Sequence, residues 1–120
     1  MTDRPLQEPT LLLLTALSDQ PRHGYGIVQE VLAISGGRVK LRTGTLYAAL
    51  QRLVDEGLIE VHHEEIVDGR ARRSYALTGS GRVRLAAEAE RLEATAREAR
   101  RRLSLADRSG FGPAPKGATA

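Results

Sequence analysis

The sequence predicts a mainly α-helical protein with one small β-hairpin, an α+β fold class, and three observations support this prediction. Up to Gly57 the chain contains three short segments that suit helices: Thr10–Leu17 is rich in good helix formers, and in the two segments that follow apolar residues recur every three or four positions. After Gly57 they alternate instead, and Asp68-Gly69 divides the alternating segment as a tight turn does. From Leu85 the helical spacing returns. The expected order is therefore three helices, a hairpin and a final helix.

Length and composition limit the classes of protein to consider. The 120 residues suffice for one domain, and 41% of them are hydrophobic, whereas only 3% are aromatic. Cysteine is absent, which excludes disulfides, thiolate metal sites and cysteine nucleophiles. The longest apolar run, Leu11–Leu14, is far shorter than the roughly 20 residues of a membrane span, and residues 1–5 do not resemble a signal peptide. We therefore expect a cytoplasmic protein with no membrane partner.

The first two helices are placed by their start and stop signals. Pro9 fits the first turn of a helix over Thr10–Leu17, which Ser18–Pro21 ends. The second helix is expected to begin at His23–Gly26 and to end at the glycine pair 36–37.

The third helix is expected to follow a short basic link, residues 38–42, with Thr43 as its N-cap and Gly57 as its stop. Its apolar stripe consists of Leu46, Leu50, Leu53 and Val54. In the hairpin, the alternating positions are Ile59, Val61 and, less cleanly, His63, and then Arg73, Tyr75 and Leu77.

The final helix, which Thr78 is expected to cap, carries a narrow apolar stripe on a highly charged background. The stripe, called the seam below, repeats every four and three residues and consists of Leu85, Ala89, Leu92, Ala96, Ala99 and Leu103. Because so charged a helix with so narrow a stripe needs a partner helix, we predict a homodimer. We expect residues 107–120 to be disordered.

The positive charges are concentrated in two stretches that contain no Asp or Glu. The chain has 18 Lys and Arg against 15 Asp and Glu, and nine of the 18 lie between Glu30 and Asp55 or between Asp68 and Glu88. Such segregation concentrates positive potential and is typical of phosphate binding. Chance clustering on solvated faces gives the same pattern, so charge alone does not decide between the two.

Three helices followed by a hairpin form the winged variant of the helix-turn-helix, in which the third helix enters the DNA major groove and the hairpin contacts neighbouring phosphates. Both acid-free stretches fall on these surfaces, and small residues at Gly44 and Ala48 permit a close approach. The candidate DNA-binding residues are Lys40, Arg42, Thr43, Thr45, Tyr47, Gln51, Arg52, Arg70, Arg72 and Arg73.

Several of these assignments have alternatives. Thr43 and Thr45 also suit a helix cap, and Tyr47 suits packing beside the apolar stripe as well as it suits contact with DNA. The hairpin arginines also suit a solvated strand edge. Gln51 and Arg52 have the chemistry to read adenine and guanine, but they lie beyond the first turn.

No metal site or catalytic site is expected. His62 and His63 are neighbours on a strand and point to opposite faces, so they do not chelate one ion together. No nucleophile and base occur at a suitable spacing, and we expect neither an enzyme nor a cofactor.

The sequence resembles the PadR-like (phenolic acid decarboxylase regulator) family over roughly residues 10–85. The matching pieces are Leu11–Leu14, His23–Tyr25, Gly44–Tyr47, Ala49-Leu50, Arg52-Leu53, Glu56–Ile59, Gly69-Arg70, Arg72-Arg73, Tyr75, Leu77-Thr78 and Gly81-Arg82. Ala48 departs from the pattern, because the family often has proline there.

The resemblance implies a homodimeric, usually repressing transcriptional regulator that binds double-stranded DNA and dimerises through its C-terminal helix. It also implies release from a palindromic operator by a small-molecule effector or another signal. The corresponding organisation is a DNA-binding domain over residues 1–77, a dimerisation helix over 78–106 and a tail over 107–120. The alternative is a winged-helix module that binds proteins and not DNA.

Overall fold

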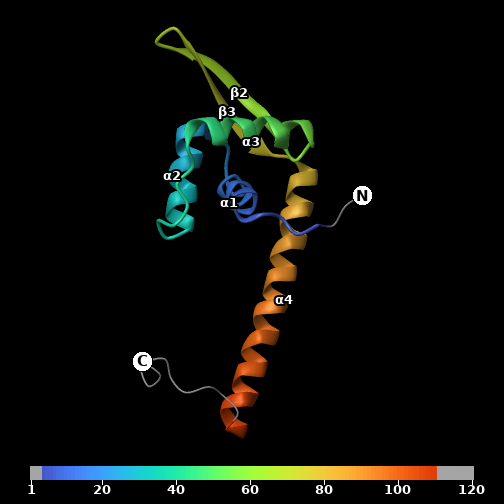
Figure 1. The fold of residues 1–120 in the computed structure, drawn as a ribbon. Helices are drawn as coiled ribbons and strands as arrows, with labels where there is room; N and C mark the ends of the chain where they lie inside the picture. Colours follow the sequence, from blue (N-terminus) through green and yellow to red (C-terminus); the bar gives the residue numbers. More distant parts are fainter. Residues whose placement is uncertain (1–3, 111–120) are drawn as a thin grey trace. The chain divides into compact units, whose positions relative to one another are not determined.

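The computed structural model describes residues 4–110 (Figure 1). Its elements, in chain order, are α1 (Glu8–Ala16), β1 (Arg22–His23), α2 (Gly24–Ile34), α3 (Thr43–Asp55), β2 (Ile59–Val67), β3 (Arg70–Leu77) and α4 (Gly79–Ser109). The predicted order of three helices, hairpin and helix is confirmed, and the mainly α-helical class with it.

The chain divides after Glu88 into two units. The first contains the three helices, the sheet and the start of α4, and the second contains the rest of α4. The division into a DNA-binding domain, a dimerisation helix and a tail is a functional prediction that contacts within one chain do not test. No helix of residues 4–110 combines the length and the apolar character that crossing a bilayer requires.

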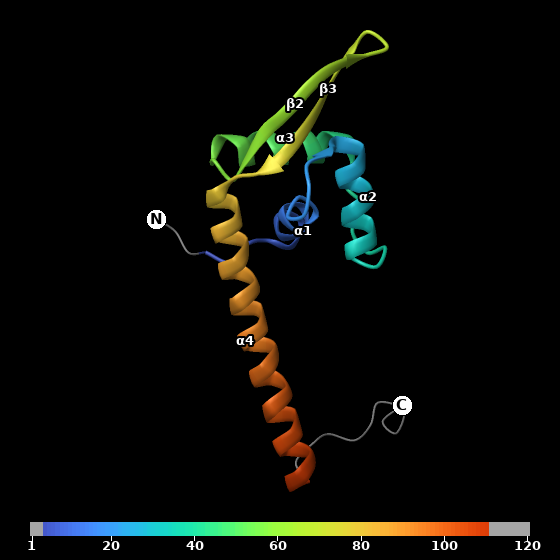
Figure 2. The same cartoon turned by 180° about the vertical axis from the view of Figure 1, so that it is seen from behind.

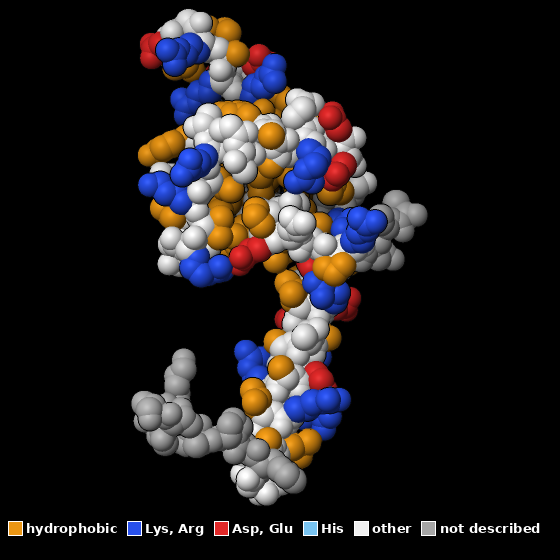
Figure 3. All heavy atoms as spheres, in the orientation of Figure 1, with side chains coloured by type: hydrophobic (Ala, Val, Ile, Leu, Met, Phe, Trp, Pro, Cys, Tyr) orange, Lys and Arg blue, Asp and Glu red, His pale blue; other side chains and the backbone are white. Residues whose placement is uncertain are grey.

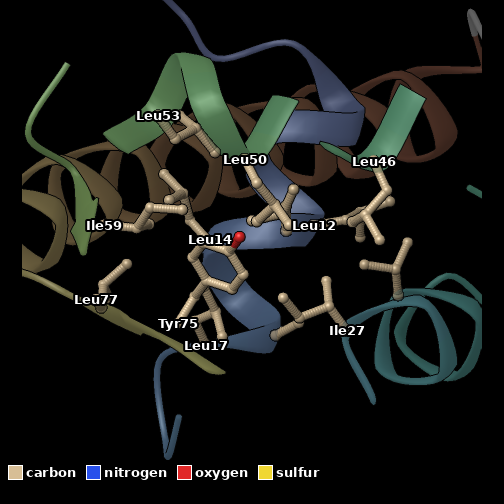
Figure 4. Close-up of a cluster of buried hydrophobic side chains, with 13 residues drawn as sticks. Leu12, Leu14, Leu17, Ile27, Leu46, Leu50, Leu53, Ile59, Tyr75 and Leu77 are labelled. Atoms are coloured by element: carbon tan, nitrogen blue, oxygen red, sulfur yellow. The ribbon is translucent and has the colours of Figure 1, made fainter. Parts of the chain in front are cut away.

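The core of the first unit lies where α1, α2, α3 and the base of the sheet meet (Figure 4). The predicted apolar stripe of α3 forms one side of this core, since Leu46, Leu50 and Leu53 are buried there, whereas Val54 is half-buried at the edge. The run Leu12–Leu14 of α1 is buried throughout, because this short helix is surrounded on most sides. Burial of these aliphatic side chains is the main driving force for folding of the unit.

The beginning of α3 differs from the sequence-based expectation. The N-cap is Arg42, with extended backbone angles (φ −86°, ψ 153°), and no side chain caps the helix. Thr43 is already the first helical residue, so its assignment as N-cap is wrong by one position. The end agrees with the prediction, because Gly57 adopts a left-handed conformation (φ +76°) and donates its N–H to the carbonyl of Val54 (3.0 Å).

The hairpin belongs to a three-stranded antiparallel sheet of order β1-β3-β2, in which β1 pairs with β3 through Arg22 and His23. The sequence did not indicate β1, because two residues show no alternation. The predicted turn is confirmed at Asp68 and Gly69, which both have positive φ (52° and 77°) as the tightest hairpin turns require. Strands β2 and β3 with this turn are called the wing below; they project from the rest of the unit in Figures 1 and 2.

A bulge interrupts the predicted alternation of the first wing strand. Val61 pairs with Tyr75, but His63 pairs with Ser74, so one extra residue is inserted between Val61 and His63. Beyond the bulge, the odd-numbered side chains lie on the opposite face of the sheet from Ile59 and Val61. The expectation that His63 continues the series of Ile59 and Val61 is therefore wrong.

The start of α4 is fixed to the end of α3. Thr78 Oγ1 accepts a hydrogen bond from the Gly81 N–H (3.0 Å), which confirms the predicted cap, and donates one to the carbonyl of Gly57 (2.6 Å). A Cβ atom at Gly81 would lie 2.1 Å from the Leu58 carbonyl oxygen, so only glycine fits at this contact. The helix continues to Ser109, beyond the expected end at 106, and residues 111–120 of the expected tail lie outside the described part of the chain.

The seam of α4 is divided between two environments. Leu85 is half-buried and packs against the core of the first unit. The other five positions lie in the second unit, where Leu92 is 40% exposed and Leu103 62% exposed. Leu85 therefore already packs against residues of its own chain. The argument for a dimer, that the seam has no packing partner, does not apply to this residue.

Candidate nucleic-acid interface

The first turn of α3 presents free backbone donors next to the basic link. The hydrogen bond from the Leu46 N–H to the Arg42 carbonyl (2.8 Å) closes this turn, and no side chain caps the preceding amides. Arg42, Thr43 and Thr45 are all exposed around them. Backbone N–H groups without acceptors at a helix N-terminus attract anions, with the helix dipole adding to the effect. Thr43 and Thr45, freed from any capping role, hold their hydroxyls at this surface.

Four of the predicted cations have no partner in the described part of the chain. Among residues 4–110, no acidic side chain forms an ion pair with Lys40, Arg42, Arg70 or Arg72, and none of these four makes a side-chain hydrogen bond. Figure 3 shows cationic side chains over the wing and over the corner where the link meets α3. Their charge is therefore available to an anion outside the protein.

Arg38 lies in the same acid-free stretch of sequence but behaves differently. Its guanidinium donates two hydrogen bonds to the Glu8 carboxylate of α1 (3.1 and 2.5 Å). The hydrogen bond from Arg38 lowers the pKa of Glu8 below its usual value and raises the pKa of Arg38. The fold thus neutralises a cation that the linear charge pattern counts as free.

The two predicted base-reading residues lie in the second half of α3 and have partners there. Gln51 donates a hydrogen bond to Asp55 (2.9 Å). Arg52 contacts the Glu56 carboxylate (3.6 Å) and the hydroxyl of Thr10 (3.1 Å). Acidic side chains accordingly appear in Figure 3 over this end of the helix. To contact a base, either side chain must first leave these partners.

The three wing arginines are divided between the two faces of β3. Arg70 pairs across the strands with Val67 and Arg72 with Glu65, whereas Arg73 pairs with Glu64. Because neighbouring residues of a strand point to opposite faces, Arg73 lies on the face of Tyr75, away from Arg70 and Arg72. Arg73 also contacts Glu64 (3.4 Å), an exposed ion pair. Alternation within the strand was visible in the sequence and would have predicted this separation.

Tyr47 lines a groove of about 440 Å³ that the start of α2, α3 and β3 form together. A Cβ atom at Gly24 would lie 2.6 Å from the Tyr47 hydroxyl, so this tyrosine packs directly on the first turn of α2. It nevertheless remains 49% exposed. The two interpretations of Tyr47, packing and contact with a ligand, are therefore compatible. The groove also contains His23 and Tyr25, which the sequence-based list of DNA-binding residues omitted although their Gly-rich segment was singled out as a helix start.

The histidines do not form a metal site in the described part of the chain. No group of three His, Cys, Asp or Glu side chains is arranged to hold an ion within residues 4–110. His63 lies 3.6 Å from Glu65 at the exposed surface of the wing. His23 Nδ1 lies 3.3 Å from the Arg73 carbonyl oxygen and helps to join β1 to β3.

Three helices, a wing and an uncapped, cation-flanked start of α3 define a winged helix-turn-helix domain. The sequence pattern that defines the transcriptional regulator PadR-like family matches residues 13–87 of this chain. Transcriptional regulator Rv3488 of Mycobacterium tuberculosis is 43% identical over 88 residues, which cover 73% of this chain and 78% of the relative. This chain therefore belongs to the PadR-like family of transcriptional regulators.

Solved structures agree with this assignment. A PadR family transcription regulator from Clostridium difficile shares the fold with a TM-score of 0.66 over 81% of this chain and 99% of that chain, at 22% identity. Bacillus subtilis PadR in complex with operator DNA aligns with a TM-score of 0.59 and 25% identity, over 67% of this chain and 46% of that chain.

Proposed function

We propose that this regulator binds double-stranded DNA as a homodimer and represses transcription from a palindromic operator until a small molecule or another signal releases it. The observation that carries the proposal is a group of cations around the uncapped start of α3 and the wing that have no partner within residues 4–110: Lys40, Arg42, Arg70 and Arg72. That B. subtilis PadR, a structural neighbour, has been solved with operator DNA supports the same partner.

In this mechanism the first turn of α3 approaches the major groove and the wing approaches the flanking backbone. Lys40 and Arg42 hold phosphates beside the helix start, where the Thr43 and Thr45 hydroxyls and the first-turn amides add hydrogen bonds. Arg70 and Arg72 extend the positive surface along one face of the wing. These contacts supply affinity and register for any sequence.

Base reading falls to the exposed residues of α3. Gln51 and Arg52 serve this role only if an operator base offers a better partner than Asp55 and Glu56 do now. Such an exchange of partners makes discrimination between bases possible, because a wrong base leaves the side chains with their internal partners.

Dimerisation is assigned to α4. The seam residues Ala89, Leu92, Ala96, Ala99 and Leu103 form a heptad stripe that a second copy of the helix would cover. A two-fold dimer presents two α3 helices, which matches a palindromic operator. We place this protein in the cytoplasm, where its DNA target lies.

The proposal is tested by selecting duplexes from a randomised library with the full-length protein. We expect enrichment of one palindromic sequence, bound at physiological salt with a Kd of about 10 nM or lower. A library that stays random after repeated selection, with only weak and strongly salt-dependent binding, would refute sequence-specific regulation and favour a module that binds proteins.

A further inference from the structure

Helix α3 is held on the core by apolar packing, and polar contacts add to the accuracy of its position. Leu46, Leu50 and Leu53 are buried, and in Figure 4 they lie opposite the leucines of α1. Burial of aliphatic side chains is non-directional, whereas a hydrogen bond favours one distance and one angle. The polar contacts that α3 makes with its neighbours therefore bear on where its DNA-facing surface lies.

Two arginines, one before α3 and one near its end, contact the first turn of α1. Arg38, in the link before α3, donates two hydrogen bonds to the Glu8 carboxylate (3.1 and 2.5 Å). Arg52, in the last turn of α3, donates one from Nη2 to Thr10 Oγ1 (3.1 Å). Glu8 and Thr10 both belong to the first turn of α1. One turn of α1 thus holds both flanks of α3.

The geometry of these contacts restrains direction as well as distance. The contact between Arg38 and Glu8 uses two nitrogens and two oxygens, an arrangement that orients the guanidinium. The second terminal nitrogen of Arg52 lies 3.6 Å from the Glu56 carboxylate, so this guanidinium lies between α1 and the end of α3. Exposed ion pairs contribute little to the free energy of unfolding. The main consequence of these contacts is therefore the position of α3.

Helix α1 is itself held at both ends by the start of α4. Arg84 Nη2 donates a hydrogen bond to the carbonyl of Arg4, before α1 (2.6 Å). Arg82 Nη1 donates one to the carbonyl of Ser18, after α1 (3.2 Å). All of these residues belong to the first unit. Helix α1 is therefore a fixed reference within that unit, against which the two arginines beside α3 are placed.

We propose that Glu8 and Thr10 are positioning residues for the reading of DNA sequence. Through Arg38 and Arg52 they hold α3 in one position, so that its exposed side chains meet the bases in one register. Neither Glu8 nor Thr10 contacts DNA. The inference rests on the proposed function and assigns Arg52 to the position of α3, which leaves base reading to other exposed side chains of that helix.

The strength of the contacts limits the size of the effect. A contact can shift the population of the reading position only by its own free energy. For an exposed ion pair this corresponds to a factor of up to about five for each protomer. Because a two-fold dimer places two α3 helices on DNA, a threefold loss in each protomer becomes a loss of about tenfold in affinity.

The first test compares Glu8→Gln with the unmodified protein by fluorescence anisotropy, on the duplex obtained by selection and on a mixed-sequence duplex. The variant should bind the selected duplex about tenfold more weakly and lose no affinity for the mixed-sequence duplex, because contacts with phosphates alone do not depend on register. Glu98→Gln is the matched control, since Glu98 also accepts hydrogen bonds from arginines, Arg101 and Arg102 of α4. It should bind both duplexes like the unmodified protein.

The competing explanation is that Glu8 masks a cation. Removal of the carboxylate would then release Arg38 toward phosphates, strengthen binding to both duplexes and raise the slope of log affinity against log salt by about 1. That result would overturn the proposal. If Glu8 positions α3, Arg38→Gln should lower the ratio of selected to mixed-sequence affinity as Glu8→Gln does. The double variant should lower it no further, because both changes break one contact.

The second test uses two threonines of α1. Thr10→Val removes the acceptor of Arg52 and should lower the ratio of selected to mixed-sequence affinity severalfold. Thr15→Val is the matched control, because the Thr15 hydroxyl donates to the Leu11 carbonyl of the same helix (2.7 Å). It should leave the ratio unchanged. Stronger binding of the selected duplex by Thr10→Val would mean that Arg52 reads a base and that Thr10 restrains it, which contradicts the proposal.

Thermal unfolding separates positioning from stability. Glu8→Gln and Thr10→Val should unfold within a few degrees of the unmodified protein, although the affinity ratio falls. Variants that unfold early and lose affinity equally for both duplexes would show a structural role and overturn the proposal.

Failure of this inference is distinguishable from failure of the proposed function. A selection that yields no preferred duplex contradicts the proposed function itself. A preferred duplex that Glu8→Gln and Thr10→Val bind as tightly as the unmodified protein leaves that function intact and refutes the positioning role of α1.

Discussion

At the scale of single residues, a cation that pairs with a carboxylate of its own chain is distinguished from one whose charge is left for DNA. Lys40 and Arg42 have none within residues 4–110, whereas Arg38, only two positions before Lys40, is held by Glu8. The sequence predicted the positive surface, but it could not predict this distinction, because Glu8 lies 30 positions away along the chain. Through-space pairing thus decides which charges remain for DNA.

Arg72 gives a prediction about phosphate contact. Arg72→Ala should weaken binding to all duplex sequences about equally and lower the slope of log affinity against log salt by about 1. The measurement is a salt titration with the selected duplex and with a mixed-sequence duplex. Arg97→Ala, which removes the same charge from exposed surface of α4, is the control. An unchanged slope for Arg72→Ala would place this side chain outside the interface.

Thr78 gives a prediction about stability. Its hydroxyl caps α4 and also bonds to the end of α3, so Thr78→Val should lower the free energy of unfolding by about 1–2 kcal/mol. Urea denaturation measures the change, with Ser80→Ala as the control for an exposed hydroxyl of the same helix. Equal stability of Thr78→Val and the unmodified protein would mean that water replaces both hydrogen bonds without cost.

At the scale of elements, the sequence predicted every helix and the hairpin, because long periodic segments and glycine stops carry clear signals. It missed β1, which is too short for any periodicity, and the bulge after Val61, since an inserted residue leaves no mark in a charged strand. The groove was beyond prediction for a similar reason. Tyr25, Tyr47 and Tyr75 come together only through the packing of three elements.

Helix α4 carries the prediction about assembly. Leu92 is an exposed leucine in the middle of the seam, and Leu92→Glu should convert dimers to monomers, because the charge would be buried against a second helix. Analytical ultracentrifugation measures the change. Arg97→Glu alters charge on the same helix outside the seam and should remain dimeric. Dimers that persist in Leu92→Glu would place the interface elsewhere.

At the scale of the whole molecule, the two units suggest a division of labour. The first unit contains the core, the start of α3, the wing and the groove, and it includes Leu85 of the seam. The second contains the rest of the seam and little that is buried. The net charge of +3 is a sum over the whole chain, so it does not describe how charge is distributed within either unit. We infer that DNA binding belongs to the first unit and that a second copy of the chain completes the second.

The most direct test of this account is a hydroxyl-radical footprint of the full-length protein on the duplex that selection yields. A two-fold dimer that places an α3 helix in each half-site predicts two protected patches related by a dyad. Their centres should lie about 10 base pairs apart or a multiple of that distance. A single unsymmetrical patch, or no protection at saturating protein, would contradict the account.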